Sequence, residues 1–476
     1  MRLSDLAGDK AGDAGAIDIA GLTADSRQVQ PGYLFAALPG VTQDGAAFVD
    51  QAVANGAAAV LAGQRLDAGV PVLTGDDPRL CLARMAARFY RSQPATVVAV
   101  TGTNGKSSIV WFLRQIWAAL NLNAACIGTL GVTTRNGHYA GGLTTPDPVA
   151  LHQQIAALAN DGVTHLALEA SSHGLAQRRM DGLALSAGAF TNLTHDHLDY
   201  HPTVDDYFDA KARLFTELLP EGAPAVINID TDFGRKLVDR ADAVGLNVTT
   251  YGQDIADFSF TSVAADLSGQ RVRLNAMDQA FSIDLPLIGD FQAENVIAAL
   301  ALAVSLGADI QRAVTGLAKI KGAPGRLQLA GGDAETAAFV DYAHTPEALR
   351  SAISALRPHT KGRIITVFGC GGDRDRAKRP LMGRIAAELS DVAIVTDDNP
   401  RTEDAAVIRA EIMAACENGI EIGDRRDAIF HAASLLKTGD VALIAGKGHE
   451  SGQIVGHQTL PFDDLSVTGA AMEKRT

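Results

Sequence analysis

The segment VVAVTGTNGKSSIVWFLRQIW, residues 97–117, combines a glycine-rich turn with a lysine and a hydroxyl group. The apolar run Val97–Val100 predicts a buried strand, and Ile109–Trp117 has the apolar spacing of a helix. A turn between a strand and a helix presents backbone N–H groups to an anion, and Lys106 adds a positive charge there. Ser107 offers a hydroxyl oxygen to Mg²⁺. The segment therefore predicts a loop that binds a polyphosphate.

One position departs from the standard phosphate-binding motif. That motif has glycine six residues before its lysine, whereas this sequence has Val100 there. A turn that only packs against the rest of the protein is the alternative. If the loop does bind phosphate, its binding residues are Gly102, Thr103, Asn104, Gly105, Lys106 and Ser107.

The length of 476 residues suggests about three domains, at roughly 150 residues each. Breaks at RSQPAT and KGAPGRLQ give domains at 1–93, 94–325 and 326–476. Alternating strand and helix patterns predict an α/β fold, with a parallel sheet in the central domain that carries the predicted phosphate loop, and a Rossmann-like last domain. In that last domain four predicted strands each run into a polar turn. They lie in AAFVDYAHTP, IITVFGCGGDRD, VAIVTDDNPR and VALIAGKGHE. We expect these turns to meet in one crevice at the strand ends.

The composition excludes several classes of protein. A net charge of −14 argues against a general nucleic-acid binder. The four cysteines form no CxxC pair, so they signal neither a disulfide framework nor a zinc site, and they fit a reducing cytoplasm. The N-terminus lacks the apolar core of a signal peptide. The apolar run from Val296 is shorter than the roughly 20 residues that span a bilayer, so we expect a buried helix after a β-rich stretch at 250–290.

Two further segments, LEASSHG and THDHLDYH, carry carboxylates and imidazoles at predicted strand ends. Carboxylate and imidazole groups suit a divalent cation, and the nearby phosphate loop favours Mg²⁺ over a dedicated zinc site. Structural capping explains any single histidine equally well. The candidate metal-binding residues are Glu169, His195, Asp196, His197 and His201. Lys211, in DYFDAKARLF, taken alone predicts a surface lysine on a helix.

Motifs along the whole chain resemble those of the Mur ligases, the ATP-dependent amino-acid-adding enzymes of peptidoglycan synthesis. TADSRQVQPGYLFAALPG resembles their N-terminal UDP-binding domain, and TGTNGKSS, TTPDP, LEASSHGLAQRR and FTNLTHDHLDYH resemble the central domain. GAPGRLQ, VDYAHTPEAL, FGCGGDRDRAKRPLM, DDNPR and GKGHE resemble the C-terminal domain. The shared order of these motifs is very specific. Departures are Ser107-Ser108, where Thr-Thr is commoner, and Pro202, where glycine is frequent.

The resemblance assigns roles to individual residues. Contact with the uridine diphosphate is implied for Ser26, and contact with the muramoyl-peptide for Thr144, Thr145, Ser171, Gln177 and Arg179. Contact with ATP is implied for Lys106 at the β- and γ-phosphates, Asn295 at adenine, and Arg326 and Asp341 at the ribose and phosphates. Two Mg²⁺ sites are implied, one with Ser107 and Glu169 and one with His197. The implied amino-acid pocket consists of Arg374, Asp398, Asn399, Arg401, Gly446 and Glu450.

The resemblance also changes the expectation for Lys211, which falls on the lysine that is carbamylated by CO₂ in this family. A free ammonium beside metal ions would be repelled, whereas N6-carboxylysine supplies an anionic oxygen ligand. The implied catalytic set is Lys106, Glu169, His197 and Lys211. The implied reaction activates the D-glutamyl carboxylate of UDP-N-acetylmuramoyl-L-alanyl-D-glutamate with ATP. The acyl-phosphate then reacts with meso-2,6-diaminopimelate, which the DNPR motif favours over L-lysine.

Two other functions fit part of these observations. Folylpolyglutamate synthetase resembles this architecture and also joins an amino acid to a glutamyl-type carboxylate, but it lacks the roughly 90 residues that precede the loop here. A nucleotide-dependent switch would explain the loop without needing DNPR and GKGHE. We expect a cytoplasmic monomer that acts on small molecules and has neither a nucleic-acid nor a membrane partner.

Overall fold

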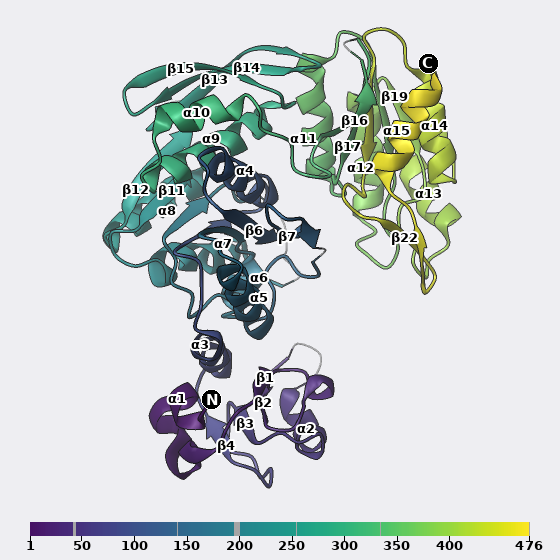
Figure 1. Cartoon of the computed structure of the whole chain (residues 1–476). Helices are drawn as coiled ribbons and strands as arrows, with labels where there is room; N and C mark the ends of the chain where they lie inside the picture. Colours follow the sequence, from purple (N-terminus) through teal and green to yellow (C-terminus); the bar gives the residue numbers. More distant parts are fainter. Residues whose placement is uncertain (41–43, 140, 195–199, 254, 334, 476) are drawn as a thin grey trace. The chain divides into compact units, whose positions relative to one another are not determined.

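The computed structural model describes residues 1–40, 44–139, 141–194, 200–253, 255–333 and 335–475 (Figure 1). The chain divides into two compact units. The first consists of Met1–Tyr251 with Ala301–Ala308, and the second of Gly252–Leu300 with Asp309–Thr476. The α/β class is confirmed. The finer division at residues 93 and 325 stays a prediction.

The first unit begins with a small parallel sheet in the order β1-β2-β3-β4. Its strands are β1 (Gly21–Thr23), β2 (Tyr33–Ala37), β3 (Ala59–Ala62) and β4 (Val72–Thr74). Its helices are α1 (Leu3–Ala7), α2 (Val49–Ala54) and α3 (Pro78–Tyr90). Helix α3 starts where Asp77 accepts a hydrogen bond from Leu80 N and Pro78 supplies a preset backbone angle. Leu34, Leu61 and Leu82 form part of the core between sheet and helices.

A second sheet contributes to this unit the strands β12-β11-β10-β5-β9-β6-β7-β8, in that order, and continues beyond β12 with β13, β14 and β15. Its strands are β5 (Thr96–Thr101), β6 (Ala124–Gly128), β7 (Gly131–Thr133), β8 (His138–Tyr139), β9 (His165–Glu169), β10 (Ala187–Phe190), β11 (Pro224–Asn228) and β12 (Asn247–Gly252). Strands β12 to β6 pair in parallel, whereas β7 and β8 are antiparallel. The predicted parallel sheet is confirmed, and β5 lies in its interior.

Helices connect these parallel strands. They are α4 (Lys106–Ala119), α5 (Pro148–Asn160), α6 (Ser172–Ala176), α7 (Val204–Arg213) and α8 (Asp232–Ala243). Val97 to Val100 are fully buried, as expected for strands that are covered on both faces. The carboxyl ends of β5, β9 and β10 therefore open onto one edge of the sheet, where the polar segments that follow them can meet.

The second unit contains an antiparallel set, β13 (Phe258–Asp266), β14 (Gly269–Ala276) and β15 (Gln279–Leu285), which confirms the predicted β-rich stretch. Helices α9 (Asp290–Ser305) and α10 (Ile310–Leu317) follow it. The apolar run of α9 from Val296 is buried, as predicted. Among the described residues, no helix is both long and apolar enough to cross a bilayer.

The main sheet of the second unit has the order β16-β17-β21-β18-β19-β20. Its strands are β16 (Gln328–Gly332), β17 (Ala337–Asp341), β18 (Ile364–Phe368), β19 (Val392–Val395), β20 (Ile420–Glu421) and β21 (Val441–Ala445). Only β16 pairs antiparallel among these strands. The four strands predicted to run into polar turns are therefore neighbours, and their turns share one edge.

Both faces of this sheet are covered by helices. On one face α11 (Pro346–Leu356), α12 (Lys378–Leu389) and α13 (Ala405–Met413) contribute Leu349, Met382 and Ile412 to the core. On the other, α14 (Arg425–Leu435) and α15 (Asp464–Arg475) contribute Ile429 and Met472, and the two helices lie side by side (Figure 1). A hairpin of β22 (Gly452–Val455) and β23 (Gln458–Pro461) precedes α15. This is the predicted doubly wound, Rossmann-like arrangement.

Candidate functional site

The predicted phosphate loop joins β5 to α4 through two glycines with positive φ. Gly102 has φ 146° and Gly105, which caps α4, has φ 88°. A Cβ atom on Gly102 would lie 1.8 Å from Thr191 Oγ1, so no other residue fits there without movement. Helix α4 begins at Lys106, three residues before the predicted Ile109. Its first N–H groups lack acceptors within the helix and suit an anion.

The segment that follows β10 holds this loop in place. Thr103 N donates to Asn192 O (2.8 Å) and Asn104 N donates to Asn192 Oδ1 (3.0 Å). Thr191 Oγ1 donates to Asn104 O (2.6 Å), and Thr194 N donates to Thr103 Oγ1 (3.0 Å). The amides of Thr103 and Asn104 therefore already have protein acceptors. Anion binding is left to N–H groups further along the loop and at the start of α4.

Two lysines converge on one carbonyl oxygen of the loop. Lys106 Nζ donates to Gly102 O (2.8 Å) and Thr103 O (2.7 Å), and Lys211 Nζ donates to Gly102 O (2.7 Å). Lys211 is only 1% exposed and its Nζ lies 4.4 Å from the centre of the Tyr207 ring. The default expectation of a surface lysine is therefore wrong. Its position on the inner face of α7 places its amino group at the loop.

Glu169 ends β9 beside the loop, because its backbone pairs in register with Val100 of β5. The side chain is 2% exposed, and Thr129 donates to it through N (2.8 Å, to Oε1) and Oγ1 (3.2 Å, to Oε2). A Cβ atom on Gly128 would lie 2.0 Å from Glu169 Oε1. Gly128 and Thr129, which the sequence analysis did not single out, therefore fix where this carboxylate lies. The sequence could have indicated them only by their position, since Gly128 ends the neighbouring strand β6 and Thr129 follows it.

The other predicted metal ligands are placed less directly. Ser107 is buried in the first turn of α4, and its hydroxyl and the Glu169 carboxylate have the oxygen chemistry that Mg²⁺ prefers. His195, Asp196 and His197 lie outside the described residues. His201 packs its ring against other aromatic rings, with centroids 4.8 Å from Tyr200 and 5.1 Å from Tyr207. No group of three or more acidic, histidine or cysteine ligands occurs among the residues that the structure describes.

The residues predicted to hold the muramoyl-peptide form one hydrogen-bonded group next to Glu169. Thr145 Oγ1 donates to Glu169 O (2.8 Å) and accepts from Ser171 N (3.0 Å). Arg179 donates to Thr145 O (2.7 Å) and to Gln177 Oε1 (2.7 Å). Burial lowers the pKa of the Arg179 guanidinium, so an anionic partner would be favoured there.

Two predicted contacts complete the first unit. Thr144 Oγ1 lies 3.0 Å from Thr129 Oγ1, which also donates to Glu169. Ser26 lies in the small N-terminal sheet region, where its hydroxyl donates to Gln51 Oε1 (2.8 Å). Thr144 therefore belongs to the group around Glu169, whereas the described contacts do not link Ser26 to it.

In the second unit, Asp341 ends β17 and fastens the turn that carries Arg326. Its carboxylate accepts from Leu327 N (2.7 Å) and Ala343 N (2.8 Å). Burial raises the pKa of Asp341, and the Arg326 cation opposes that shift. Helix α9, which carries the buried Asn295, is tied to the same turn because Gln292 Nε2 donates to Arg326 O (2.8 Å). The three residues predicted to bind the nucleoside thus lie on connected elements.

The turns after β19 and β21 bring the predicted amino-acid pocket together. Asn399 Nδ2 donates to Glu450 Oε2 (2.9 Å). Lys447, which is fully buried, donates to Asn399 Oδ1 (3.0 Å) and to Glu450 Oε2 (2.9 Å). Gly446 has φ 120°, and a Cβ atom there would lie 2.5 Å from Asp398 Oδ2. Lys447 was not predicted, although it lies within GKGHE directly after a buried strand.

Arg401 adopts a left-handed backbone conformation, with φ 52°, that is uncommon for a residue with a side chain. The hairpin holds this conformation, because Arg401 N donates to Ile454 O (3.0 Å) and Arg401 O accepts from Gly456 N (2.7 Å). Arg401 Nη1 donates to Gly372 O (2.8 Å). Arg374 lies exposed on the same turn as Gly372. The structure thus adds β22 to the predicted pocket.

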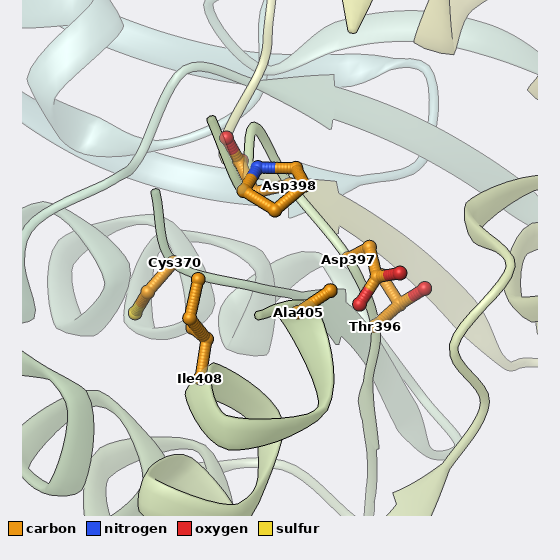
Figure 2. Close-up of a pocket in the computed structure, with 7 residues that line it drawn as sticks. Cys370, Thr396, Asp397, Asp398, Ala405 and Ile408 are labelled. Atoms are coloured by element: carbon orange, nitrogen blue, oxygen red, sulfur yellow. The ribbon is translucent and has the colours of Figure 1, made fainter. Parts of the chain in front are cut away.

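Figure 2 shows a small pocket whose lining includes Asp398 and Pro400. Cys370, Ala405 and Ile408 line it together with Thr396 and Asp397. Burial raises the pKa of the Cys370 thiol to about 12, so the thiol stays protonated and is a poor nucleophile. Cys370 is therefore no candidate nucleophile, and the pocket shares Asp398 with the predicted amino-acid pocket.

Comparison with known proteins matches all three parts of the chain to one family. The Mur ligase middle domain matches residues 100–303, the Mur ligase glutamate ligase domain matches 325–448, and the Mur ligase family catalytic domain matches 18–90. A protein of Brucella melitensis biotype 1 named UDP-N-acetylmuramoyl-L-alanyl-D-glutamate–2,6-diaminopimelate ligase is 53% identical over 468 residues, covering 98% of this chain and 96% of that protein.

Solved structures agree. A structure of a UDP-N-acetylmuramoyl-L-alanyl-D-glutamate–2,6-diaminopimelate ligase is 34% identical with a TM-score of 0.75, covering 100% of this chain and 99% of that one. A Mycobacterium tuberculosis folylpolyglutamate synthase complexed with ADP and AMPPCP shares the fold, at 19% identity and a TM-score of 0.64, and covers 77% of this chain and 92% of its own.

Proposed function

The chain belongs to the Mur ligase family, and we propose on that basis that it joins meso-2,6-diaminopimelate to UDP-N-acetylmuramoyl-L-alanyl-D-glutamate. It is an ATP-dependent ligase of peptidoglycan precursor synthesis. The observation that carries this assignment is the full-length match at 53% identity to a protein of that name. The alternative, a folylpolyglutamate synthetase, does not account for the family match at residues 18–90.

The reaction proceeds in two chemical steps. The D-glutamyl carboxylate attacks the γ-phosphorus of ATP, which gives an acyl-phosphate and ADP. The amine of diaminopimelate then attacks the acyl carbon, a proton leaves the nitrogen, and phosphate departs from the tetrahedral intermediate. In this proposal Lys106 and the N–H groups at the start of α4 neutralise charge on the phosphoryl group as it transfers.

Mg²⁺, when bound, withdraws negative charge from the phosphates of ATP. We assign Ser107 and Glu169 to hold it, because both supply oxygen beside the loop. His197 is assigned to a second ion and stays a prediction. Thr129 keeps the Glu169 carboxylate in one orientation.

We further propose that Lys211 acts as N6-carboxylysine. Lys106 and Lys211 both donate to Gly102 O, so two ammonium groups would lie close together in a buried place and repel each other. Reaction of the uncharged Lys211 amine with CO₂ forms an N–C bond and releases one proton. The product is an anion that removes this repulsion and adds an oxygen ligand for a cation.

The substrate contacts are proposed residue by residue. Thr144, Thr145, Ser171, Gln177 and Arg179 would hold the muramoyl-peptide beside Glu169, and Ser26 the uridine diphosphate. Asn295, Arg326 and Asp341 would hold the nucleoside end of ATP. Arg374, Asp398, Asn399, Arg401, Gly446 and Glu450 would line the amino-acid pocket.

Within that pocket, Arg401 and Glu450 have separate tasks. The planar guanidinium of Arg401 can grip the distal carboxylate of diaminopimelate through two hydrogen bonds. Glu450 can accept from the distal ammonium. Because ATP and nucleotide-linked precursors are made in the cytoplasm, we propose that the enzyme works there, and the monomeric state stays a prediction.

Phosphate release tests the proposal. The enzyme is incubated with ATP, Mg²⁺, UDP-N-acetylmuramoyl-L-alanyl-D-glutamate and meso-diaminopimelate, and then with each component left out in turn. Steady release should require all of them and should match amide product one to one. Release that needs a folate in place of the UDP-linked substrate would identify the alternative enzyme, and release without an acceptor would indicate a nucleotide switch.

A further inference from the structure

Lys447 is a buried cation in the amino-acid pocket that the proposed reaction does not use. Its side chain is fully buried, and a buried ammonium group must find hydrogen-bond acceptors or a counter-charge. It has both, because its Nζ donates to Asn399 Oδ1 (3.0 Å) and to Glu450 Oε2 (2.9 Å). Both acceptors belong to residues that are proposed to bind the amino acid. Lys447 therefore acts on the pocket through these two residues.

The contacts of Lys447 orient the Asn399 amide. Asn399 Oδ1 accepts from Lys447 Nζ and from Ile454 N (2.9 Å), which fixes that end of the amide as the oxygen. The nitrogen end then donates to Glu450 Oε2 (2.9 Å). One oxygen of Glu450 is therefore shared between a cation and an amide donor. The other oxygen, Oε1, is the one left to meet a ligand.

Lys447 also changes what Glu450 can attract. An ammonium 2.9 Å from a carboxylate oxygen offsets part of its negative charge, and the Lys447 end of this pair is fully buried whereas the Glu450 side chain is 34% exposed. A substrate ending in a bare ammonium, as L-lysine does, would rely on Glu450 alone. A zwitterionic end has a carboxylate as well, and that group can pair with Arg401, whose Nη1 lies 3.5 Å from Asn399 O.

We propose that Lys447 is a specificity-determining residue, which partly neutralises Glu450 so that the pocket accepts a zwitterionic side chain and rejects a bare ammonium. This inference rests on the proposed function. Two cations, Arg401 and Lys447, are tied to Asn399, and together they make the surroundings of Glu450 unfavourable for an extra positive charge. Discrimination against L-lysine then comes from Lys447 as well as from Arg401.

The test uses Lys447→Met, which keeps an unbranched stem and removes the charge. We expect kcat/KM for meso-diaminopimelate to fall roughly tenfold, because Asn399 and Glu450 lose a charge-assisted partner. The kcat/KM for L-lysine should stay constant or rise. The ratio of kcat/KM for meso-diaminopimelate to kcat/KM for L-lysine should therefore fall at least tenfold. KM for ATP and for the UDP-linked substrate should stay unchanged. Lys437→Met, an exposed lysine in the same unit, is the matched control.

An equal fall for both amino acids, or no change for either, would overturn the proposal, because a merely structural role does not alter the ratio. Lys447→Gln removes the charge but keeps a hydrogen-bond donor, so it separates the two effects. It also replaces Lys447→Met if a thermal melt shows that the Met variant is not folded. If neither variant folds, the role is structural and the proposal is wrong. In a Glu450→Gln background, Lys447→Met should leave the ratio unchanged, because no carboxylate remains to be neutralised.

The unmodified enzyme separates this inference from the proposed function. If it forms no product with meso-diaminopimelate, the proposed function fails and the specificity argument has no substrate. If it forms product and the ratio does not respond to Lys447→Met, the function stands and only the role of Lys447 is refuted.

Discussion

The phosphate loop (Gly102–Ser107) and the amino-acid pocket (Asp398–Arg401 with Gly446–Glu450) both lie at the carboxyl ends of parallel strands, but different forces hold them. The phosphate loop is fixed by its own backbone N–H groups, which donate to Asn192 O and Oδ1, and by close packing against Gly102. In the amino-acid pocket, side chains hold side chains, as Lys447 holds both of its neighbours. The phosphate loop is thus held mainly through its backbone groups, whereas the amino-acid pocket is held by interactions between charged and polar side chains.

This difference leads to an expected division of labour. Residues around the phosphate loop should control activation of the carboxylate and thus kcat with every amino acid. Residues of the amino-acid pocket should control which amino acid is used and leave the nucleotide untouched. Variants in the two regions can sharpen or break this comparison.

The largest effect is expected for Lys211→Ala. This variant removes the group proposed to become an anionic ligand, so kcat should fall roughly 1000-fold, as when a preorganised charge-stabilising group is lost elsewhere. KM for the UDP-linked substrate should stay within twofold of the unmodified value. Short carboxylic acids should restore part of the rate by supplying the missing oxygens. Lys236→Ala, an exposed lysine on α8, is the control, and near-normal turnover of Lys211→Ala would sink the carbamate proposal.

Gly128→Ala is expected to have the next largest effect. Its new Cβ would lie 2.0 Å from Glu169 Oε1, so the carboxylate must move. A displacement of about 1 Å at a reacting centre can cost roughly 100-fold in rate. We expect such a loss in kcat, together with a higher Mg²⁺ requirement in a titration of activity. Gly142→Ala, where a Cβ meets nothing within 4 Å, should have no effect. An unchanged Mg²⁺ dependence in Gly128→Ala would remove Glu169 from the metal site.

Arg401→Ala should affect the amino-acid pocket alone. Loss of a charge-assisted pair with the distal carboxylate should lower kcat/KM for meso-diaminopimelate roughly 10- to 100-fold. The KM values for ATP and for the UDP-linked substrate should stay nearly constant, since Arg401 is assigned to the amino-acid pocket and to neither of these substrates. Steady-state kinetics with each substrate varied in turn measure all three. A comparable rise in the KM for ATP would contradict the division between the two regions.

The smallest effect is expected for Gly371→Ala. Its Cβ would lie 2.7 Å from Arg401 Nη1, which is the movable end of a side chain, so the guanidinium can shift without unfolding the turn. KM for meso-diaminopimelate should rise several-fold, to roughly tenfold at most. The neighbouring Gly372→Ala would place a Cβ 1.9 Å from Pro400 O, which is backbone, and should instead lower the melting temperature. Equal melting temperatures for both variants would show that the turn around Arg401 is not as rigid as described.

The sequence predicted much of the fold because the strands are local and strongly apolar. Strand β5 and the polar turns after β17, β18, β19 and β21 follow from short runs of residues, so spacing alone locates them. The phosphate loop was predictable for the same reason. Only the start of helix α4 was predicted three residues too late. Lys106 and the two serines after it are polar, so the first turn of α4 lacks the apolar spacing of a helix.

The amino-acid pocket depends on contacts between distant residues, and a single sequence does not contain that information. Asn399 and Lys447 lie on different strand ends and meet only because β21 inserts between β17 and β18 in the sheet. The role of Asn399 came from resemblance to a family, and Lys447 was not predicted at all. The hairpin that fixes Arg401 and the burial of Lys211 on the inner face of α7 were visible only in the folded chain.

Positional isotope exchange tests the division most directly. ATP labelled with ¹⁸O in the bridge between the β- and γ-phosphates is incubated with Mg²⁺ and the UDP-linked dipeptide, without any amino acid. Reversible formation of the acyl-phosphate moves the label out of the bridge. The account predicts equal exchange in the unmodified enzyme and in Arg401→Ala, and none in Lys211→Ala. Loss of exchange in Arg401→Ala, or its persistence in Lys211→Ala, would contradict the separation of carboxylate activation from amino-acid selection.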